Sequence, residues 1–222
     1  MPLLVRPATE ADSTRSGIIG RDAFRDIFHE SLFPPHLAHK SETGDLELDE
    51  AQWRTTRNLR RIRDGQPTFV VLDAAEDAST AEEVVAVAHW QPPLQTPPSA
   101  AATFATKDPV PGSLDLKKAE EIFRVMTDET TKVLGPDWHE NTWFLVHLAV
   151  DPNHQRRGIG KMLVRYGLDL AQKDGKDAFL ISTPAGRGMY RSVGFRDVGE
   201  PFPICGIPHY PMMWTKPDPT LV

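Results

Sequence analysis

The segment Gln155–Gly160, with the sequence QRRGIG, carries the strongest chemical signal in this chain. It follows an apolar run, Thr142–Val150, and leads into a helical pattern that begins at Gly158. The first N–H groups of a helix have no partner inside the helix, the helix dipole is positive there, and glycines let the backbone approach an anion closely. The spacing therefore indicates a phosphate-binding turn, although glycines after a strand also serve simple tight turns.

Two other phosphate motifs are excluded at this position. Gly160 and Lys161 resemble the end of a P-loop, but Gln155 stands where glycine is needed and Met162 where Ser or Thr would hold magnesium. The glycines at 158 and 160 also begin like a dinucleotide fingerprint, but Leu163 replaces its third small residue.

Two motifs in the right order resemble the GCN5-related N-acetyltransferase (GNAT) superfamily. Leu148–Gly160 is similar to its acetyl-CoA signature, Q/R-x-x-G-x-G/A at the start of a helix after a central strand. Tyr190–Phe195 is similar to its Tyr-x-x-x-Gly-Phe element, and Arg6–Thr9 is a typical opening. The resemblance covers nearly the whole chain except about 91–141. The combination of this Pro-rich insert with the sequence Pro184–Gly186 is similar to that of uncharacterised fungal members of the family.

The resemblance implies acetyl-CoA as co-substrate, and the residues themselves lead us to expect no metal. The central strand is expected to separate from its neighbour, so that its free backbone groups bind the pantetheine arm and polarise the thioester carbonyl. Arg156 or Arg157 would reach the 3′-phosphate, and Thr183 stands where many members carry Asn. The expected cofactor-binding residues are Leu148, Ala149, Val150, Gln155, Arg156, Arg157, Gly158, Ile159, Gly160, Lys161, Thr183, Gly186 and Tyr190.

The implied reaction is direct attack of a primary amine on acetyl-CoA in a ternary complex, and it needs a base and an acid. Tyr190 matches the family's acid, the alternative being a packing aromatic. The family often places Glu or His at the positions that Phe144 and Val146 occupy here, and neither can take a proton. His147 is therefore the expected base. Strict strand alternation would point it to the other face unless a bulge re-aims it.

Other interpretations of the base remain open. His147 could be a core or helix-facing histidine, His139 and Glu140 lie just before the strand, and a water chain could carry the proton. A single cysteine, Cys205, excludes a disulfide framework, and His36 and His39 have no carboxylate at metal-ligand spacing.

Helical and strand patterns alternate around these motifs and predict an α/β (α+β) fold. We expect a central mixed, mostly antiparallel sheet of about six to seven strands, flanked by helices, in a single domain over 1–222 with a Pro-rich and helical insert at about 91–141. The expected helices end near 33 and span 46–64, 114–134, 158–173 and 185–193, and the expected strands span 3–6, 68–73, 83–90, 142–150, 178–182, 195–199 and 210–216. An acidic turn, Ala74–Ala81, would join two of the strands, and the basic second half of the 46–64 helix is expected to be a solvated face.

Composition narrows the function. The chain has 222 residues, 20 of them prolines. Its net charge of −6 disfavours nucleic acid as a binding partner and weakly favours a cationic acceptor. No run is long enough to cross a membrane and no secretory signal is recognisable, so a cytoplasmic monomer or homodimer is expected. The insert is expected to wall in the acceptor site, which favours a small-molecule amine over a protein lysine or N-terminus. A non-catalytic acyl-CoA-binding module is the alternative from another class.

Overall fold

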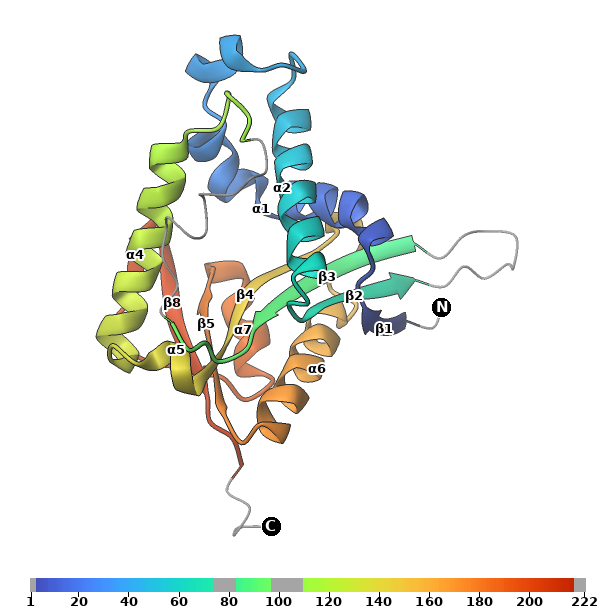
Figure 1. Ribbon diagram of the computed structural model, residues 1–222. Helices are drawn as coiled ribbons and strands as arrows, with labels where there is room; N and C mark the ends of the chain where they lie inside the picture. The colour runs from blue at the N-terminus through green and yellow to red at the C-terminus, as the bar shows by residue number, and fades with distance from the viewer. Residues whose placement is uncertain (1–2, 74–82, 97–109, 218–222) are drawn as a thin grey trace.

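The computed structural model describes residues 3–73, 83–96 and 110–217, which form one twisted sheet covered by helices on both faces (Figure 1). The strand order is β1-β2-β3-β4-β5-β8-β6, with β7 pairing β8 outside this path. Every pairing is antiparallel except β4 with β5. The expected mixed, mostly antiparallel sheet is therefore confirmed. The strands are β1 Leu3–Pro7, β2 Thr68–Asp73, β3 Glu83–Gln91, β4 Thr142–Val150, β5 Asp177–Ser182, β6 Arg196–Asp197, β7 Phe202–Ile204 and β8 Ile207–Trp214.

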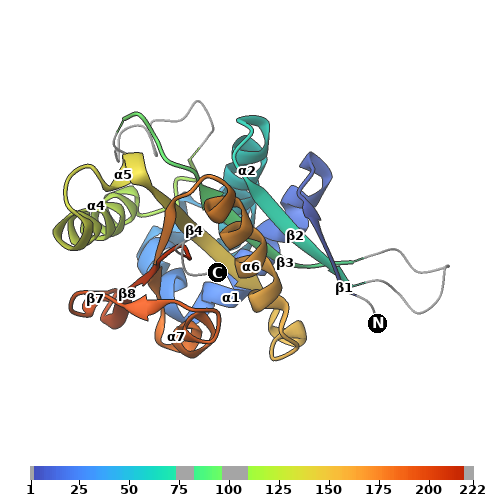
Figure 2. The same ribbon diagram turned by 90° about the horizontal axis from the view of Figure 1, so that it is seen from below.

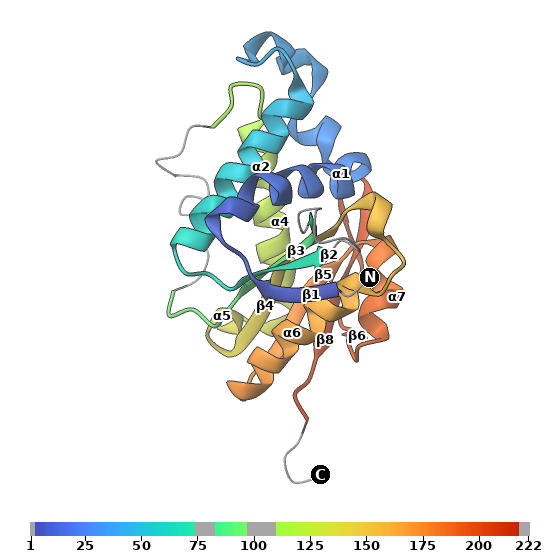
Figure 3. The ribbon, with the colours of Figure 1, turned by 90° about the vertical axis from the view of Figure 1, so that its right-hand side faces the viewer.

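The helices form two layers. Helices α1 and α2 cover one face of the sheet and α6 the other, as Figures 2 and 3 show from two directions. Ile19 of α1 packs against β2, β3 and β4, whereas Leu163 and Val164 of α6 pack into the larger core on the opposite face. The helices are α1 Ser13–Leu32, α2 Leu46–Arg63, α4 Leu116–Leu134, α5 Trp138–Asn141, α6 Ile159–Lys173 and α7 Pro184–Arg191, with 3-10 turns at Glu10–Asp12, Pro35–Lys40 and Pro152–His154.

Most element boundaries follow the sequence patterns. Strands β2 and β4 have the predicted bounds, and α2 and α6 differ from theirs by one residue. The difference lies near the C-terminus, where the predicted strand 195–199 is only the two residues of β6 and a further hairpin joins β7 to β8 through Cys205 and Gly206. The predicted turn Ala74–Ala81 and the prolines at 97, 98 and 109 lie outside the described residues.

Strand β4 separates from β5 after a short contact. The two strands pair only at Thr142–Phe144 with Asp177–Phe179. Beyond Phe144, β4 continues beside β3 as far as Val150 while β5 diverges. The expected opening of the sheet is thus present, and it begins before Leu148.

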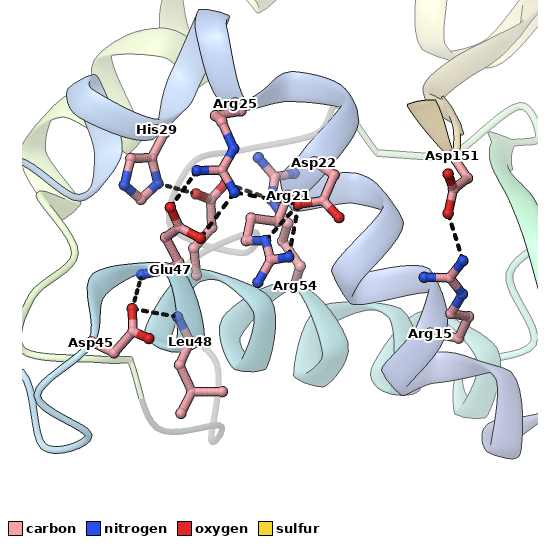
Figure 4. Close-up of polar contacts among 11 residues, drawn as sticks. Arg15, Arg21, Asp22, Arg25, His29, Asp45, Glu47, Leu48, Arg54 and Asp151 are labelled. Carbon is pink, nitrogen blue, oxygen red and sulfur yellow. Dashed lines mark hydrogen bonds and ion pairs between the residues drawn. The ribbon is translucent and has the colours of Figure 1, made fainter. Parts of the chain in front are cut away.

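Helices α1 and α2 are joined by charged side chains (Figure 4). Arg25 of α1 pairs with Glu47 of α2. Glu50, whose side chain is fully buried, accepts hydrogen bonds from Arg54 Nε at 2.7 Å and pairs with His29 Nδ1 at 2.6 Å. This interface fixes the rotation of α2 and therefore which of its residues face the sheet. No helix among the described segments has the length and apolar character needed to span a bilayer.

Candidate active site

A cavity of about 1350 Å³ extends from the start of α6, along the gap between β4 and β5, to the space between α2 and α4. One end is lined by Arg156, Gly158 and Lys161, and the other by side chains of α1, α2 and α4. The two sites that the sequence predicts, a phosphate turn and an acceptor site, therefore belong to one continuous space.

The turn before α6 is built to hold an anion. Gly158 has φ 82°, a left-handed conformation that side-chain-bearing residues adopt at a cost. The backbone N–H groups of Ile159, Gly160 and Lys161 have no acceptor within the part of the chain that the structure describes. Free N–H groups at the positive end of a helix, with Arg156 and Lys161 on the same wall, fit the pyrophosphate of coenzyme A.

The two arginines of this turn face different surroundings. Arg156 lines the cavity, whereas the Arg157 guanidinium donates to Asp73 Oδ2 at 2.5 Å, outside the cavity wall. This hydrogen bond raises the pKa of Arg157 and lowers that of Asp73. The prediction that the Arg157 side chain binds the cofactor is thus not supported, because Asp73 at the end of β2 already holds it.

Backbone groups of β4 face the gap in the sheet. Asp151 N–H donates to Val85 O of β3 at 2.9 Å. Since backbone groups alternate along a strand, those of Leu148 and Val150 point to the side that β5 has left. Gln155 Nε2 donates to the Val150 carbonyl at 3.3 Å, which ties the phosphate turn to this strand. Leu148 and Val150 thus present backbone donors and an acceptor to the gap, and their binding of the cofactor stays a prediction.

Tyr190 of α7 lines the cavity beyond this gap. Its ring packs edge-on against Phe195, with centroids 5.9 Å apart, and burial raises the pKa of its hydroxyl. A side chain at Gly186 would come within 2.9 Å of the Tyr190 ring, so glycine is needed there. Thr183 Oγ1 accepts from Gly186 N–H at 3.3 Å and caps α7, which leaves the Thr183 hydroxyl proton for another partner. Within the described residues the Tyr190 hydroxyl has no hydrogen-bond partner, so it is available to a ligand.

A bulge directs His147 into the cavity. The pairing of β3 with β4 shifts between His89 and Trp90, so that Val146 is an extra residue in β4. After this bulge, His147 and Ala149 lie on the α1 face with Phe144 and Val146. The His147 ring lies 5.2 Å from that of Phe24, and burial, followed by the charges of nearby arginines, lowers its pKa well below 6.5.

The alternative bases lie elsewhere. The cavity wall includes neither His139 nor Glu140. His139 is buried, with Nδ1 donating to Leu94 O at 3.2 Å, and Glu140 is exposed on α5. Neither is placed to reach an amine beside the β4–β5 gap.

Two further histidines on the wall were not predicted from the sequence. His89, opposite His147, has its Nδ1 3.1 Å from Thr68 Oγ1. His209 donates from Nδ1 to Ile207 O at 2.9 Å, which leaves its buried Nε2 as an acceptor without a partner among the described residues. No sequence motif surrounds either residue, and only the pairing of strands brings them here.

The basic stripe on α2 is not the solvated face that we expected. Arg54, Arg57 and Arg61 share one side of the helix and line the cavity. Burial lowers the pKa of Arg57 to about 10, and the pKa of Arg61 falls well below 12.5 for the same reason, with further lowering by neighbouring arginines. The spacing i, i+3, i+7 of these arginines showed that they share one side of the helix. It does not tell whether that side of the helix faces solvent or a cavity.

Comparisons with known proteins agree with this geometry. The family model "Acetyltransferase (GNAT) domain" matches residues 99–216. An acetyltransferase from the fungus Stachybotrys chartarum is 31% identical over 147 residues, which cover 64% of this chain and 62% of that protein, less than two thirds of its length. The chain belongs to the GNAT family of acetyltransferases.

Solved structures show the same fold at low sequence identity. A structure titled as histone acetyltransferase HPA2 and related acetyltransferase, from Corynebacterium glutamicum, has a TM-score of 0.60 at 19% identity and covers 99% of both chains. The PaiA N-acetyltransferase of Thermoplasma acidophilum, in complex with coenzyme A, has a TM-score of 0.54 at 12% identity over 97% of this chain and 99% of its own.

Proposed function

We propose that this protein transfers an acetyl group from acetyl-CoA to the primary amine of a small molecule. One observation carries the proposal: a single cavity joins the free N–H groups at the start of α6 to the opened strand β4, with Tyr190 and His147 both on its wall. Family membership and the fold of a coenzyme A complex support the choice of acyl donor.

The residues divide the reaction among them. Acetyl-CoA supplies an activated acetyl thioester. The N–H groups of Gly160 and Lys161 hold the pyrophosphate, and a backbone N–H of β4 at Leu148 or Val150 donates to the thioester oxygen as negative charge develops there. His147 takes one proton from the ammonium so that the neutral amine can attack. A C–N bond forms, the C–S bond breaks, and Tyr190 gives its proton to the leaving sulfur. The nitrogen loses a second proton after the attack, and this proton replaces the one that Tyr190 has given.

The acceptor side is walled, which favours a compact amine. Helix α4, within the 91–141 segment, contributes Ile122, Phe123 and Met126 to the cavity opposite the arginines of α2. Helices α4 and α2 lie apart in Figure 1, and residues of both line the cavity. A lysine side chain or an N-terminus of a protein would have to enter between these helices.

The test is release of free thiol from acetyl-CoA in the presence of an amine panel that includes amino acids, arylalkylamines, polyamines and tail peptides. We expect release with a small amine and formation of its N-acetyl product. Turnover of peptides alone would favour a protein acceptor. Tight coenzyme A binding with no turnover of any amine would contradict the proposal and favour a non-catalytic acyl-CoA-binding module.

A further inference from the structure

Four arginines of α2 line the cavity, Arg54, Arg57, Arg60 and Arg61, and those on its inner side are held differently. Arg54 is anchored by Glu50, at 2.7 Å from Nε to Oε1. Arg57 lies over the Trp53 ring, 5.1 Å from its centroid. Arg61 has no carboxylate and no other hydrogen-bonding partner for its guanidinium in the described parts of the chain. It is nevertheless partly buried beside Arg54, Arg57 and Arg60.

An arrangement of this kind is unfavourable without an anion. Taking a guanidinium out of water costs free energy unless a partner replaces the lost hydrogen bonds, and nearby like charges add to that cost. Asp64, exposed at the end of α2, is the only carboxylate among the described residues that line the cavity. The lining also contains Arg156 and Lys161 at the phosphate end, so the cavity is basic although the chain carries −6.

The wall opposite the arginines is apolar. It is formed by Ala119, Ile122, Phe123 and Met126 of α4, with Trp138 beside them. Phe24, Phe28 and Leu32 of α1 line the cavity between α2 and α4, and the centroid of the Phe24 ring lies 5.9 Å from the guanidinium carbon of Arg54. A ligand that spans the cavity therefore meets apolar side chains on one side and guanidinium groups on the other.

We propose that the acceptor is an amine that also carries a carboxylate and an apolar body, an apolar amino acid being the simplest example, and that Arg61 binds its carboxylate. This inference rests on the proposed acetyl transfer and names the substrate class. A guanidinium offers two parallel N–H donors to a carboxylate, a geometry that a single ammonium group does not provide.

The same charges act on the amine. Positive charge near an ammonium group favours its neutral form, and only the neutral amine can attack the thioester. A polyamine or a basic peptide would bring further positive charge to this wall and would be repelled. The proposed acceptor therefore differs from the weakly expected cationic one, because that expectation came from net charge alone and not from the local distribution of charge.

The first experiment measures kcat/KM for phenylalanine and leucine against their amides, which keep the amine and the apolar body but lack the charge. The amine of the amide loses its proton more readily, so intrinsic reactivity favours the amide. We expect the acids to be preferred about 10- to 100-fold, as for hydrogen bonds between charged groups. Equal or better turnover of the amides would overturn the inference and leave acetyl transfer intact.

The second experiment does not require turnover. Calorimetry on the coenzyme A-saturated protein compares 3-phenylpropanoate with 3-phenylpropanamide. We expect the acid to bind at least about tenfold more tightly. If it does so while no amine is acetylated, the proposed function fails and the carboxylate site remains. If acid and amide bind alike, the carboxylate site is wrong whatever the turnover.

Variants separate a binding role from a structural one. Arg61→Gln should remove the preference for acid over amide. It should leave the melting temperature of the ligand-free protein equal or higher, because an uncompensated cation is removed. Arg63→Gln is the matched control: it makes the same change of charge on α2, but Arg63 is exposed and pairs with Glu10 outside the cavity. Loss of stability in Arg61→Gln with an unchanged acid-to-amide ratio would overturn the assignment.

Discussion

His147 of β4 lies directly opposite His89 of β3, and both rings face the cavity. Burial lowers the pKa of each well below 6.5, and the arginines of α2 lower it further: Arg54, Arg61 and Arg57 act on His147, and Arg61 and Arg57 on His89. Both histidines are therefore neutral near pH 7. A neutral imidazole beside the opened strand is the form that a general base requires.

Stability should fall at acidic pH because of this pair. Each histidine has a lower pKa in the folded than in the unfolded state, so its contribution is complete above about pH 6.5 and is lost as the pH falls below that value. The expected slope is at most about 1.4 kcal/mol per pH unit for each residue. Urea unfolding between pH 5 and 7.5 measures it. A variant with both His89→Gln and His147→Gln should show a shallower slope, whereas the exposed His39→Gln should match the wild type. Equal slopes in all three proteins would contradict the assignment.

The pH–rate profile tests His147 as the base. Wild-type kcat/KM should have an acidic limb with an apparent pKa below 6.5, because the imidazole must be neutral to accept the proton. His147→Gln should lower kcat/KM by about 10²- to 10⁴-fold and remove that limb. His89→Gln is the companion variant. Persistence of the limb in His147→Gln and its loss in His89→Gln would assign the proton to His89 instead.

Tyr190→Phe removes one oxygen from a ring that stays packed on Phe195. Without the acid, expulsion of the thiolate should slow by about 10²- to 10⁴-fold, while affinity for coenzyme A and the melting temperature stay close to wild type. Steady-state thiol release and calorimetry with coenzyme A measure these quantities. Unchanged kcat would leave Tyr190 as a packing residue only.

The two glycines of the phosphate turn should respond differently to alanine. Gly158→Ala must hold a side chain at φ 82°, which costs about 1–2 kcal/mol and moves the free N–H groups. Gly160→Ala would meet Met189 at 3.5 Å, an ordinary contact. We therefore expect weaker coenzyme A binding in Gly158→Ala and near wild-type binding in Gly160→Ala, both measured by calorimetry. The reverse order would contradict the turn as described.

Arg156 and Arg157 should differ in their effect on the 3′-phosphate. Arg156 lines the cavity, whereas Arg157 is held by Asp73. We expect Arg156→Gln to reduce the preference for coenzyme A over dephospho-coenzyme A. Arg157→Gln should weaken both ligands alike, because it only loosens the turn. The ratio of the two dissociation constants is the measurement, and an unchanged ratio in Arg156→Gln would exclude a 3′-phosphate contact.

Local hydrophobic patterns were sufficient to predict the strand and the helix on either side of the proposed cofactor-binding turn. The apolar run of β4 and the helical stripe of α6 each have one dominant period, and the turn between them has glycines at diagnostic spacing. Strand β7 was missed because it has three residues and contains Pro203, which interrupts any strand pattern.

Features that depend on contacts between distant segments could not be predicted from the pattern of a single segment. The bulge at Val146 exists only in the register between β3 and β4, so the direction of His147 remained open until that register was known. The sequence predicted a solvated Arg61 because the cavity that it lines is assembled from segments distant in the chain, among them β3, β4 and α4.

The short pairing of β4 with β5 leaves the sheet as two antiparallel halves, β1–β4 and β5–β8, joined along a seam of three residue pairs. Helix α6 packs against β2, β3 and β4 on one side of the seam and β5 on the other. A ligand bound between β4 and β5 would therefore contact both halves of the sheet where no backbone hydrogen bonds join them. We therefore expect a bound ligand to join the two halves of the sheet and to reduce their motion relative to each other.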